Sequence, residues 1–187
     1  MKKILLLSFI TLFGLKSFAQ ETGNDSYTIQ RLIIFNEKGE VLLQKHKNGW
    51  MTPALRHNTE VTINKGLLAL ATDFGLEVSI PQLQGIFMYF HSDNKKPSFR
   101  QHYSCKLITG ELKTPKGALN VNWFSLNEVV KKMLIPDAKI VSSVGEATKQ
   151  IFDYPNIIWG GSYMLVKGNG KTKSQMIENF YPIGKIE

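Results

Sequence analysis

One stretch in the middle of the chain shows apolar residues at helical spacing. Steps of three and four residues place them on one face of a helix, and we expect that face to be buried. Its members are Ile63, Leu67, Leu70, Ala71 and Phe74. Thr62 is a suitable N-cap and Gly75 a suitable C-terminal stop, so the pattern predicts a helix between these two residues. The opposite face carries Lys65, Ala69, Thr72 and Asp73.

Strands are predicted on both sides of this helix, where β-branched and aromatic residues are enriched or alternate with polar ones. The turn sequence Asn36-Glu37-Lys38-Gly39 separates predicted strands at 27–35 and 41–45, as in a hairpin. Residues 54–61 are expected to be irregular. Beyond the helix, the pattern predicts strands at 84–91, 98–108 and 119–124, short helices at 125–133 and 138–151, and a closing hairpin formed by 157–166 and 172–181.

The predicted strand at 98–108 alternates clearly between its two faces. One side carries Phe99, Gln101, Tyr103, Cys105 and Leu107. The other side carries Arg100, His102, Ser104 and Lys106. Because residues two apart on a strand point the same way, Arg100 and His102 leave the sheet together. They form either the wall of a polar cleft or a solvent-facing part of the sheet.

The N-terminus has the three parts of a secretory signal. Two lysines precede an apolar run at residues 4–15, and the small-residue cleavage motif Ser17-Phe18-Ala19 follows. The run is shorter than the roughly 20 residues that cross a bilayer, which argues against a membrane anchor. We expect residues 1–19 to be a cleaved signal peptide and residues 20–26 a flexible lead-in. The mature protein is then exported, periplasmic or secreted, with no membrane anchor after cleavage.

Composition and charge are those of one ordinary globular domain. The formal charge of +8 includes three leader lysines, Lys2, Lys3 and Lys16, whose loss leaves +5 on the mature chain. The remaining lysines lack the Arg, Lys and aromatic clustering of a nucleic-acid surface, so no nucleic-acid partner is expected. The charge favours attraction to anionic ligands. Cys105 is the only cysteine, which excludes an intramolecular disulfide and predicts a buried, inert thiol.

Several residues lie at spacings typical of a known family. Gly39, Trp50, Pro53, Gly75-Leu76 and Trp123 follow one another as they do in Nudix hydrolases. When Gly75-Leu76 is placed on the last two positions of that family's Nudix box, Glu60 falls on the first glutamate without a gap. The sequence therefore resembles the Nudix hydrolase family over about residues 28–133, with the box at 54–76.

The resemblance implies an α/β fold, an α/β/α sandwich around a mixed β-sheet. Residues 27–187 would form this Nudix-like domain, with a C-terminal helix and a β-hairpin extension at 137–187. The tail from about residue 157 lies outside the resemblance. Trp50 and Trp123 are expected to pack in the core or at its rim.

The same register shows where the box departs from the family pattern. The positions of its glycine, its Arg-Glu pair and its Glu-Glu pair are occupied by Ala54, Leu68, Ala69, Thr72 and Asp73. Family members cleave pyrophosphates with divalent metal ions, and hard cations need several oxygen ligands. The box keeps Glu60 and Asp73 as carboxylates, and Lys65 adds a charge that repels metal ions. This degenerate box does not favour efficient hydrolysis.

The resemblance indicates the candidate site residues. Glu60 is the candidate catalytic residue, and Glu60 and Asp73 are the candidate metal ligands. Alternatively, Glu60 supports the loop or the helix N-terminus, and Asp73 is a solvated residue. The candidate ligand-binding residues are Arg56, His57, Arg100 and His102. In the family, the loop that contains Arg56-His57 approaches the substrate phosphates; a solvated loop pair is the alternative.

Two functions remain open at this point. The first is a non-catalytic or weakly active binding or accessory protein that holds an anionic or phosphate-bearing ligand without a cofactor. The second is a divergent Nudix hydrolase that cleaves a diphosphate linkage with Mg²⁺ or Mn²⁺, and it needs a further carboxylate such as Glu111 or Glu128. The aromatic tail residues Trp159, Tyr163, Phe180 and Tyr181 pack either within the chain, which we favour, or in a homodimer.

Overall fold

The computed structural model describes residues 27–57, 60–93, 96–134, 142–168 and 172–186. The predicted signal peptide and lead-in lie outside these residues. The elements are β1 (Thr28–Phe35), β2 (Val41–His46), β3 (Gly49–Met51), β4 (Ala54–His57), α1 (Ile63–Asp73), β5 (Leu76–Val78), β6 (Gln82–His91), β7 (Ser98–Gly110), β8 (Asn120–Phe124), α2 (Leu126–Met133), α3 (Ser142–Asp153), β9 (Ile157–Lys167) and β10 (Thr172–Lys185). No helix in the described part of the chain is long and apolar enough to cross a membrane.

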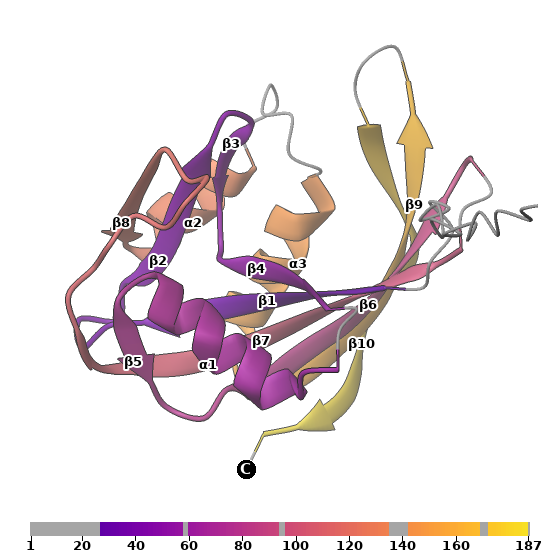
Figure 1. Cartoon of the computed structure of the whole chain (residues 1–187). Helices are drawn as coiled ribbons and strands as arrows, with labels where there is room; N and C mark the ends of the chain where they lie inside the picture. Colours follow the sequence, from indigo (N-terminus) through magenta and orange to yellow (C-terminus); the bar gives the residue numbers. More distant parts are fainter. Residues whose placement is uncertain (1–26, 58–59, 94–95, 135–141, 169–171, 187) are drawn as a thin grey trace, which may run out of the picture.

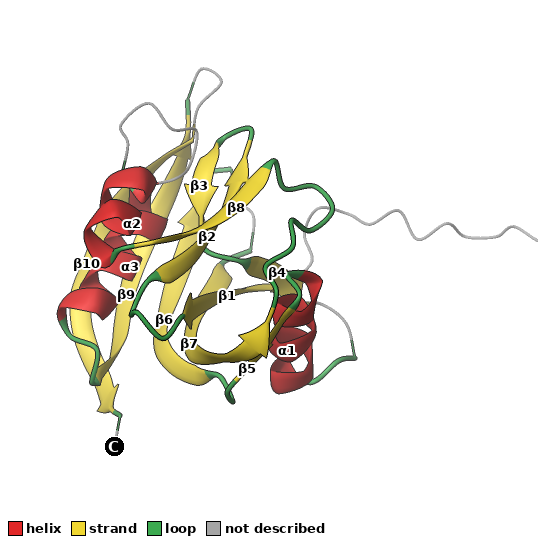
Figure 2. Ribbon diagram, turned by 90° about the vertical axis from the view of Figure 1, so that its left-hand side faces the viewer, coloured by secondary structure: helices red, strands yellow, loops and turns green. Residues whose placement is uncertain are grey.

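The strands join in one mixed sheet between two helical layers. The order along its main path is β10-β9-β6-β7-β1-β2-β3, with β4, β5 and β8 paired to it at the side. β1 runs parallel to β7, and β6 runs parallel to β9. α1 lies on one side of the sheet and α2 and α3 on the other (Figure 1), and Figure 2 shows the three layers edge-on. The predicted α/β/α sandwich is confirmed.

Both faces of the central strands are buried, because each face has its own apolar core. On the α1 side, Leu32 and Ile34 of β1 pack with Leu67 of the helix. On the other side, Ile33 of β1 packs with residues of α2 and α3, among them Val129. A strand covered on both faces needs apolar residues at successive positions, which explains the continuous run Leu32-Ile33-Ile34.

The predicted helix 62–75 is confirmed with its two ends. α1 begins after Thr62, and Gly75 beyond its C-terminus has a φ of 76°, a conformation that favours glycine. Leu67 and Ala71 are fully buried, whereas Ile63 is 38% exposed. The predicted apolar face is therefore buried from the second turn of the helix onward.

The prediction that residues 54–61 are irregular is wrong for 54–57, which form β4. This strand pairs antiparallel with β1, with Thr28 opposite His57 and Arg31 opposite Ala54. Its partner lies more than twenty residues earlier in the chain, so the local pattern carries no sign of the pairing. The short strands β3 and β5 were likewise not predicted.

The C-terminal hairpin is confirmed as β9 and β10, which pair antiparallel. It is not a separate appendage, because β9 also pairs with β6 and extends the main sheet. Trp159 and Tyr163 are buried, and Phe180 packs against the same core, so intramolecular packing is confirmed for these residues. Tyr181 remains 43% exposed. A homodimer stays a prediction. The predicted helix at 138–151 corresponds to α3, and its first four residues lie outside the described ranges.

Candidate functional site

The box positions that would carry metal ligands lie on the exposed side of α1. Ala69, Thr72 and Asp73 all face solvent, as does Lys65. Glu60 is also exposed and precedes the helix, whereas Asp73 is the last of its 11 residues. At about 1.5 Å per residue, a helix of this length spans about 15 Å. The two candidate metal ligands therefore stand at opposite ends of α1.

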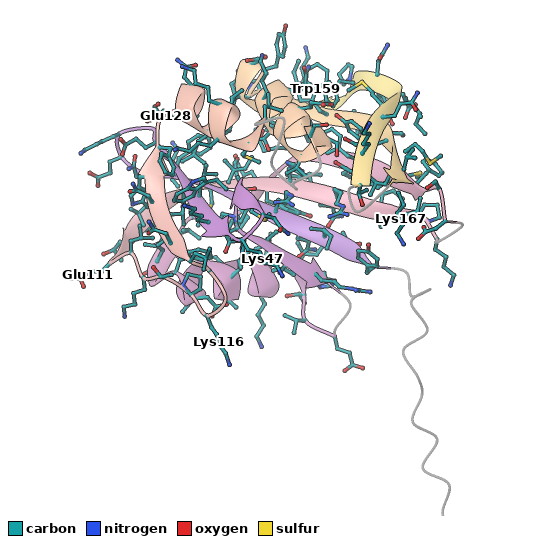
Figure 3. All side chains as sticks on the ribbon, turned by 90° about the horizontal axis from the view of Figure 1, so that it is seen from above. Lys47, Glu111, Lys116, Glu128, Trp159 and Lys167 are labelled. Carbon is teal, nitrogen blue, oxygen red and sulfur yellow. The ribbon has the colours of Figure 1, made fainter. Side chains whose placement is uncertain are left out.

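The proposed additional carboxylate Glu128 has a different role. The backbone N–H of Ser125 donates to its carboxylate at 3.0 Å and the Ser125 hydroxyl at 2.7 Å, which lowers the pKa of Glu128 and forms a capping box at the start of α2. α2 lies across the sheet from α1, and Figure 3 shows Glu111 and Glu128 at separate places along one end of the molecule. The hypothesis that Glu128 completes a metal site with Glu60 and Asp73 is wrong. No group of three or more His, Cys, Asp or Glu side chains among the described residues is placed to hold a metal ion.

Arg56 and His57 lie on β4 and not in a loop, so they point to opposite faces of the sheet. The exposed Arg56 guanidinium lies over the Tyr27 ring, 4.0 Å from its centroid. The His57 ring nitrogen Nε2 lies 2.6 Å from the Val61 carbonyl oxygen, shortly before the start of α1. His57 is thus a structural contact on the α1 side, while Arg56 faces the other way.

Arg100 and His102 point from the same face of β7, as predicted, but that face is covered. His102 is 0% exposed and its ring contacts Phe87, a member of the core under α2 and α3. Burial, followed by the positive charges of Arg31 and Arg100, holds the pKa of His102 well below its ordinary value, so the ring is neutral at pH 7. The solvent-facing interpretation is therefore wrong for His102, which has no solvent contact, whereas Arg100 is half-buried.

Arg31 joins Arg100 and His102 on this face, and the sequence pattern did not single it out. In the parallel register of β1 and β7, Arg31 pairs with His102 and Ile29 with Arg100, so all these side chains leave the same side of the sheet. Arg31 is 5% exposed and donates from Nη1 to the Thr52 carbonyl at 3.3 Å and its hydroxyl at 3.4 Å. Burial, followed by repulsion from Arg100, lowers the pKa of Arg31 to about 10, which leaves it cationic at pH 7.

Tyr89 and Ser143 complete the polar surroundings of the two arginines. The Arg100 guanidinium lies 4.8 Å from the centroid of the Tyr89 ring, which stacks on Tyr163. The Tyr163 hydroxyl donates to Glu146 of α3 at 3.1 Å. Burial raises the pKa of Tyr89, an effect that the Ser143 hydroxyl and Arg100 oppose. The cationic cluster, as we call it, comprises Arg31, Arg100, His102, Tyr89 and Ser143.

Comparison with solved structures identifies the fold of the chain. The crystal structure of a mutator MutT protein from Bacillus halodurans superposes with a TM-score of 0.60 at 18% identity, over 83% of this chain and 96% of that chain. A Nudix hydrolase from Nitrosomonas europaea superposes with a TM-score of 0.57 at 18% identity, over 76% of this chain and 80% of that chain. A MutT protein from Methanosarcina mazei Go1 superposes with a TM-score of 0.55 at 15% identity, over 71% of this chain and 96% of that chain. The chain has the Nudix fold.

This fold agrees with the register assigned to the box. α1 stands where the box helix was placed, between Thr62 and Gly75. The sequence itself matches no family profile and no curated protein. The chain thus has the Nudix fold without a sequence match to a family profile.

Proposed function

We propose that the mature protein is an exported Nudix-fold protein that binds an anionic or phosphate-bearing ligand and has little or no hydrolytic activity. The observation that carries the proposal is the contrast between the two faces of the sheet. On α1, the side chains at the metal-ligand positions of the box are those of Ala69, Thr72 and Asp73. On the other face, Arg31 and Arg100 bring two positive charges to one place.

The chemistry of the α1 surface argues against metal-assisted hydrolysis. Attack on a pyrophosphate needs a metal ion that neutralises phosphate charge and activates water, and such an ion needs several oxygen ligands close together. The side chains of Ala69, Thr72 and Asp73 provide a methyl group, a hydroxyl and one carboxylate, which are a poor set of ligands for a divalent cation. The Thr72 hydroxyl is further engaged, since it donates to the Leu68 carbonyl at 3.0 Å within the helix.

Arginine provides a metal-free way to hold the same ligands. Its planar guanidinium donates two parallel hydrogen bonds to a phosphate or carboxylate and keeps its charge at neutral pH. Ile29 of β1 pairs with Arg56 of β4 along one edge and with Arg100 of β7 along the other. Arg56 and Arg100 therefore lie on the same face of the sheet. This geometry supports a ligand-binding surface that extends from the exposed Arg56 toward the half-buried Arg100.

The test is calorimetric titration of residues 20–187 with Mg²⁺ and Mn²⁺, followed by a phosphate-release screen with nucleotides and diphosphate sugars. We expect neither tight metal binding nor turnover. Metal binding that disappears in Glu60→Gln, together with turnover, would contradict the proposal and establish the protein as a divergent hydrolase.

Export is tested separately. We expect a full-length chain produced in a Gram-negative host to reach the periplasm and to begin at Gln20 by N-terminal sequencing. A product that retains Met1 in the cytoplasm would refute this part of the proposal.

A further inference from the structure

The cationic cluster contains buried nitrogen atoms that have no hydrogen-bond partner among the described residues. They are Arg31 Nε, Arg100 Nε and both ring nitrogens of His102. An unpaired buried polar group costs stability, and native proteins leave few of them. Here several belong to one cluster on one face of the sheet, which indicates a common missing partner.

The charge of the cluster identifies the chemistry of that partner. Arg31 and Arg100 are cationic, and no ion pair reaches either of them within the described part of the chain. The nearby carboxylate Glu146 accepts a hydrogen bond from Tyr163 and makes no salt bridge with the arginines. Buried charges are normally paired, because removing a lone ion from water is expensive. The absent partner is therefore an anion.

The hydrogen-bonding inventory narrows the anion further. Guanidinium groups only donate, and tyrosine, serine and neutral histidine can each donate one hydrogen bond. Several donors that converge on one place suit an oxyanion, whose oxygens only accept. Carboxylates and phosphates share this chemistry.

The cluster joins a partly accessible residue to fully buried ones, and its side chains are held in place. Arg100 is half-buried, whereas Arg31 and His102 are 5% and 0% exposed. Arg31 is held by Thr52 and Arg100 by the Tyr89 ring. Side chains that are already fixed lose little entropy when a ligand binds.

We propose that the cationic cluster is a metal-free oxyanion site that takes the phosphate or carboxylate end of the ligand between the sheet and α3. This inference rests on the proposed function and makes it specific: the anionic group enters the interior at Arg31 and Arg100 and does not lie on the exposed Arg56. The ligand class is thus a small molecule with a terminal phosphate monoester or carboxylate.

The test uses residues 20–187 in buffer that contains EDTA, with phenyl phosphate and benzoate as probes and chloride as the reference at equal ionic strength. Binding is measured by thermal unfolding and by calorimetry. We expect one of the two probes to raise the melting temperature by at least 3 °C, a shift that corresponds to roughly 1 kcal/mol for a chain of this size. The stronger probe identifies the terminal group as phosphate or carboxylate.

Three variants locate the site. Arg31→Gln and Arg100→Gln keep a side-chain N–H but remove the charge, and each should weaken binding of the stronger probe at least tenfold. Arg56→Gln tests the competing surface position: a buried site predicts a change in affinity of less than twofold. Lys106→Gln, which removes an exposed charge from the same strand as Arg100, is the matched control and should also change binding less than twofold. The melting temperature of each ligand-free variant is measured as well, because Arg31→Gln removes the buried hydrogen bonds to Thr52 together with a charge that has no ion-pair partner among the described residues. This measurement separates loss of binding from loss of folding.

Other outcomes overturn the inference. Binding that is lost in Arg56→Gln and kept in Arg31→Gln would place the anion on the surface and leave the proposed function intact. Absence of a shift with both probes would refute the buried site. The metal titration and turnover screen decide the proposed function independently, since they are carried out on the wild-type chain. An ¹⁵N spectrum that shows the Arg31 Nε–H signal unmoved by the bound probe would also contradict the assignment.

Discussion

The two sides of the central sheet differ in where they place polar groups. On the outer surface of α1, the positions of the box carboxylates are filled by Ala69, Thr72 and Asp73, all of them exposed. On the face under α3, Arg31 and His102 are buried where apolar side chains would be expected. One side carries few carboxylates at its surface, and the other holds costly polar groups inside. Buried unpaired charge is the less tolerable departure, so it is the stronger indicator of function.

The α1 side is held in place by a close contact between two glycines, and breaking it gives the largest expected effect. A Cβ at Gly110, where φ is 119°, would lie 2.3 Å from the Gly75 carbonyl oxygen. Gly110→Ala is expected to cost about 3 kcal/mol, since both the backbone conformation and the packing oppose it. Gly117→Ala is the matched control, because its φ is 91° but a Cβ would meet nothing within 4 Å. Urea unfolding of both variants checks the prediction, and equal losses would show that the contact is unimportant.

Adding carboxylates on α1 tests the proposal that the side chains of this helix are too poor in carboxylates to bind a metal ion. We expect the triple variant Ala69→Glu, Thr72→Glu, Asp73→Glu to fold, because all three positions are exposed, and to bind Mn²⁺ about 100-fold more tightly than the wild type. Calorimetric titration measures the change. The corresponding triple glutamine variant is the control for helix surface effects. If the glutamate variant gains no affinity, features outside α1 prevent metal binding.

The buried His102 should make stability depend on pH. Its folded pKa is well below the ordinary value of about 6.5, so acidification through pH 6.5 protonates the unfolded chain first and destabilises the folded one. Between pH 7 and pH 5.5 this group should cost about 1 kcal/mol. Over the same pH range, the free energy of unfolding of His102→Leu should fall by about 1 kcal/mol less than that of the wild type. Urea unfolding measures this difference. The other three histidines are common to both proteins, and identical pH dependence would show that His102 is accessible to protons when folded.

The smallest effect is expected at the start of α2. Ser125→Ala removes the hydroxyl partner of Glu128 and should cost less than about 1 kcal/mol of stability in thermal unfolding.

Glu128→Gln should leave Mn²⁺ binding unchanged, because the carboxylate caps α2 on the side of the sheet away from α1. A change in metal affinity would return Glu128 to the list of candidate ligands.

The sequence by itself determined the elements that depend on local rules. The helix from Thr62 to Gly75 follows from spacing and end residues, and the turn at 36–39 from its composition. The spacing of the box residues predicted a Nudix-like fold, and the structure has that fold. Local rules also predicted that Arg100 and His102 share a face of their strand, since side chains alternate along any strand.

Only the tertiary structure decided what covers each face. Alternation does not tell which side of β7 meets solvent. The core that contains Phe87 covers the polar side at His102, so His102 is a buried residue. β4 exists because it pairs with β1, and the same pairing turns Arg56 and His57 to opposite faces. Arg31 comes next to His102 through the parallel register of two strands that are seventy residues apart. The cationic cluster is a product of such long-range pairing, and no local pattern contains that information.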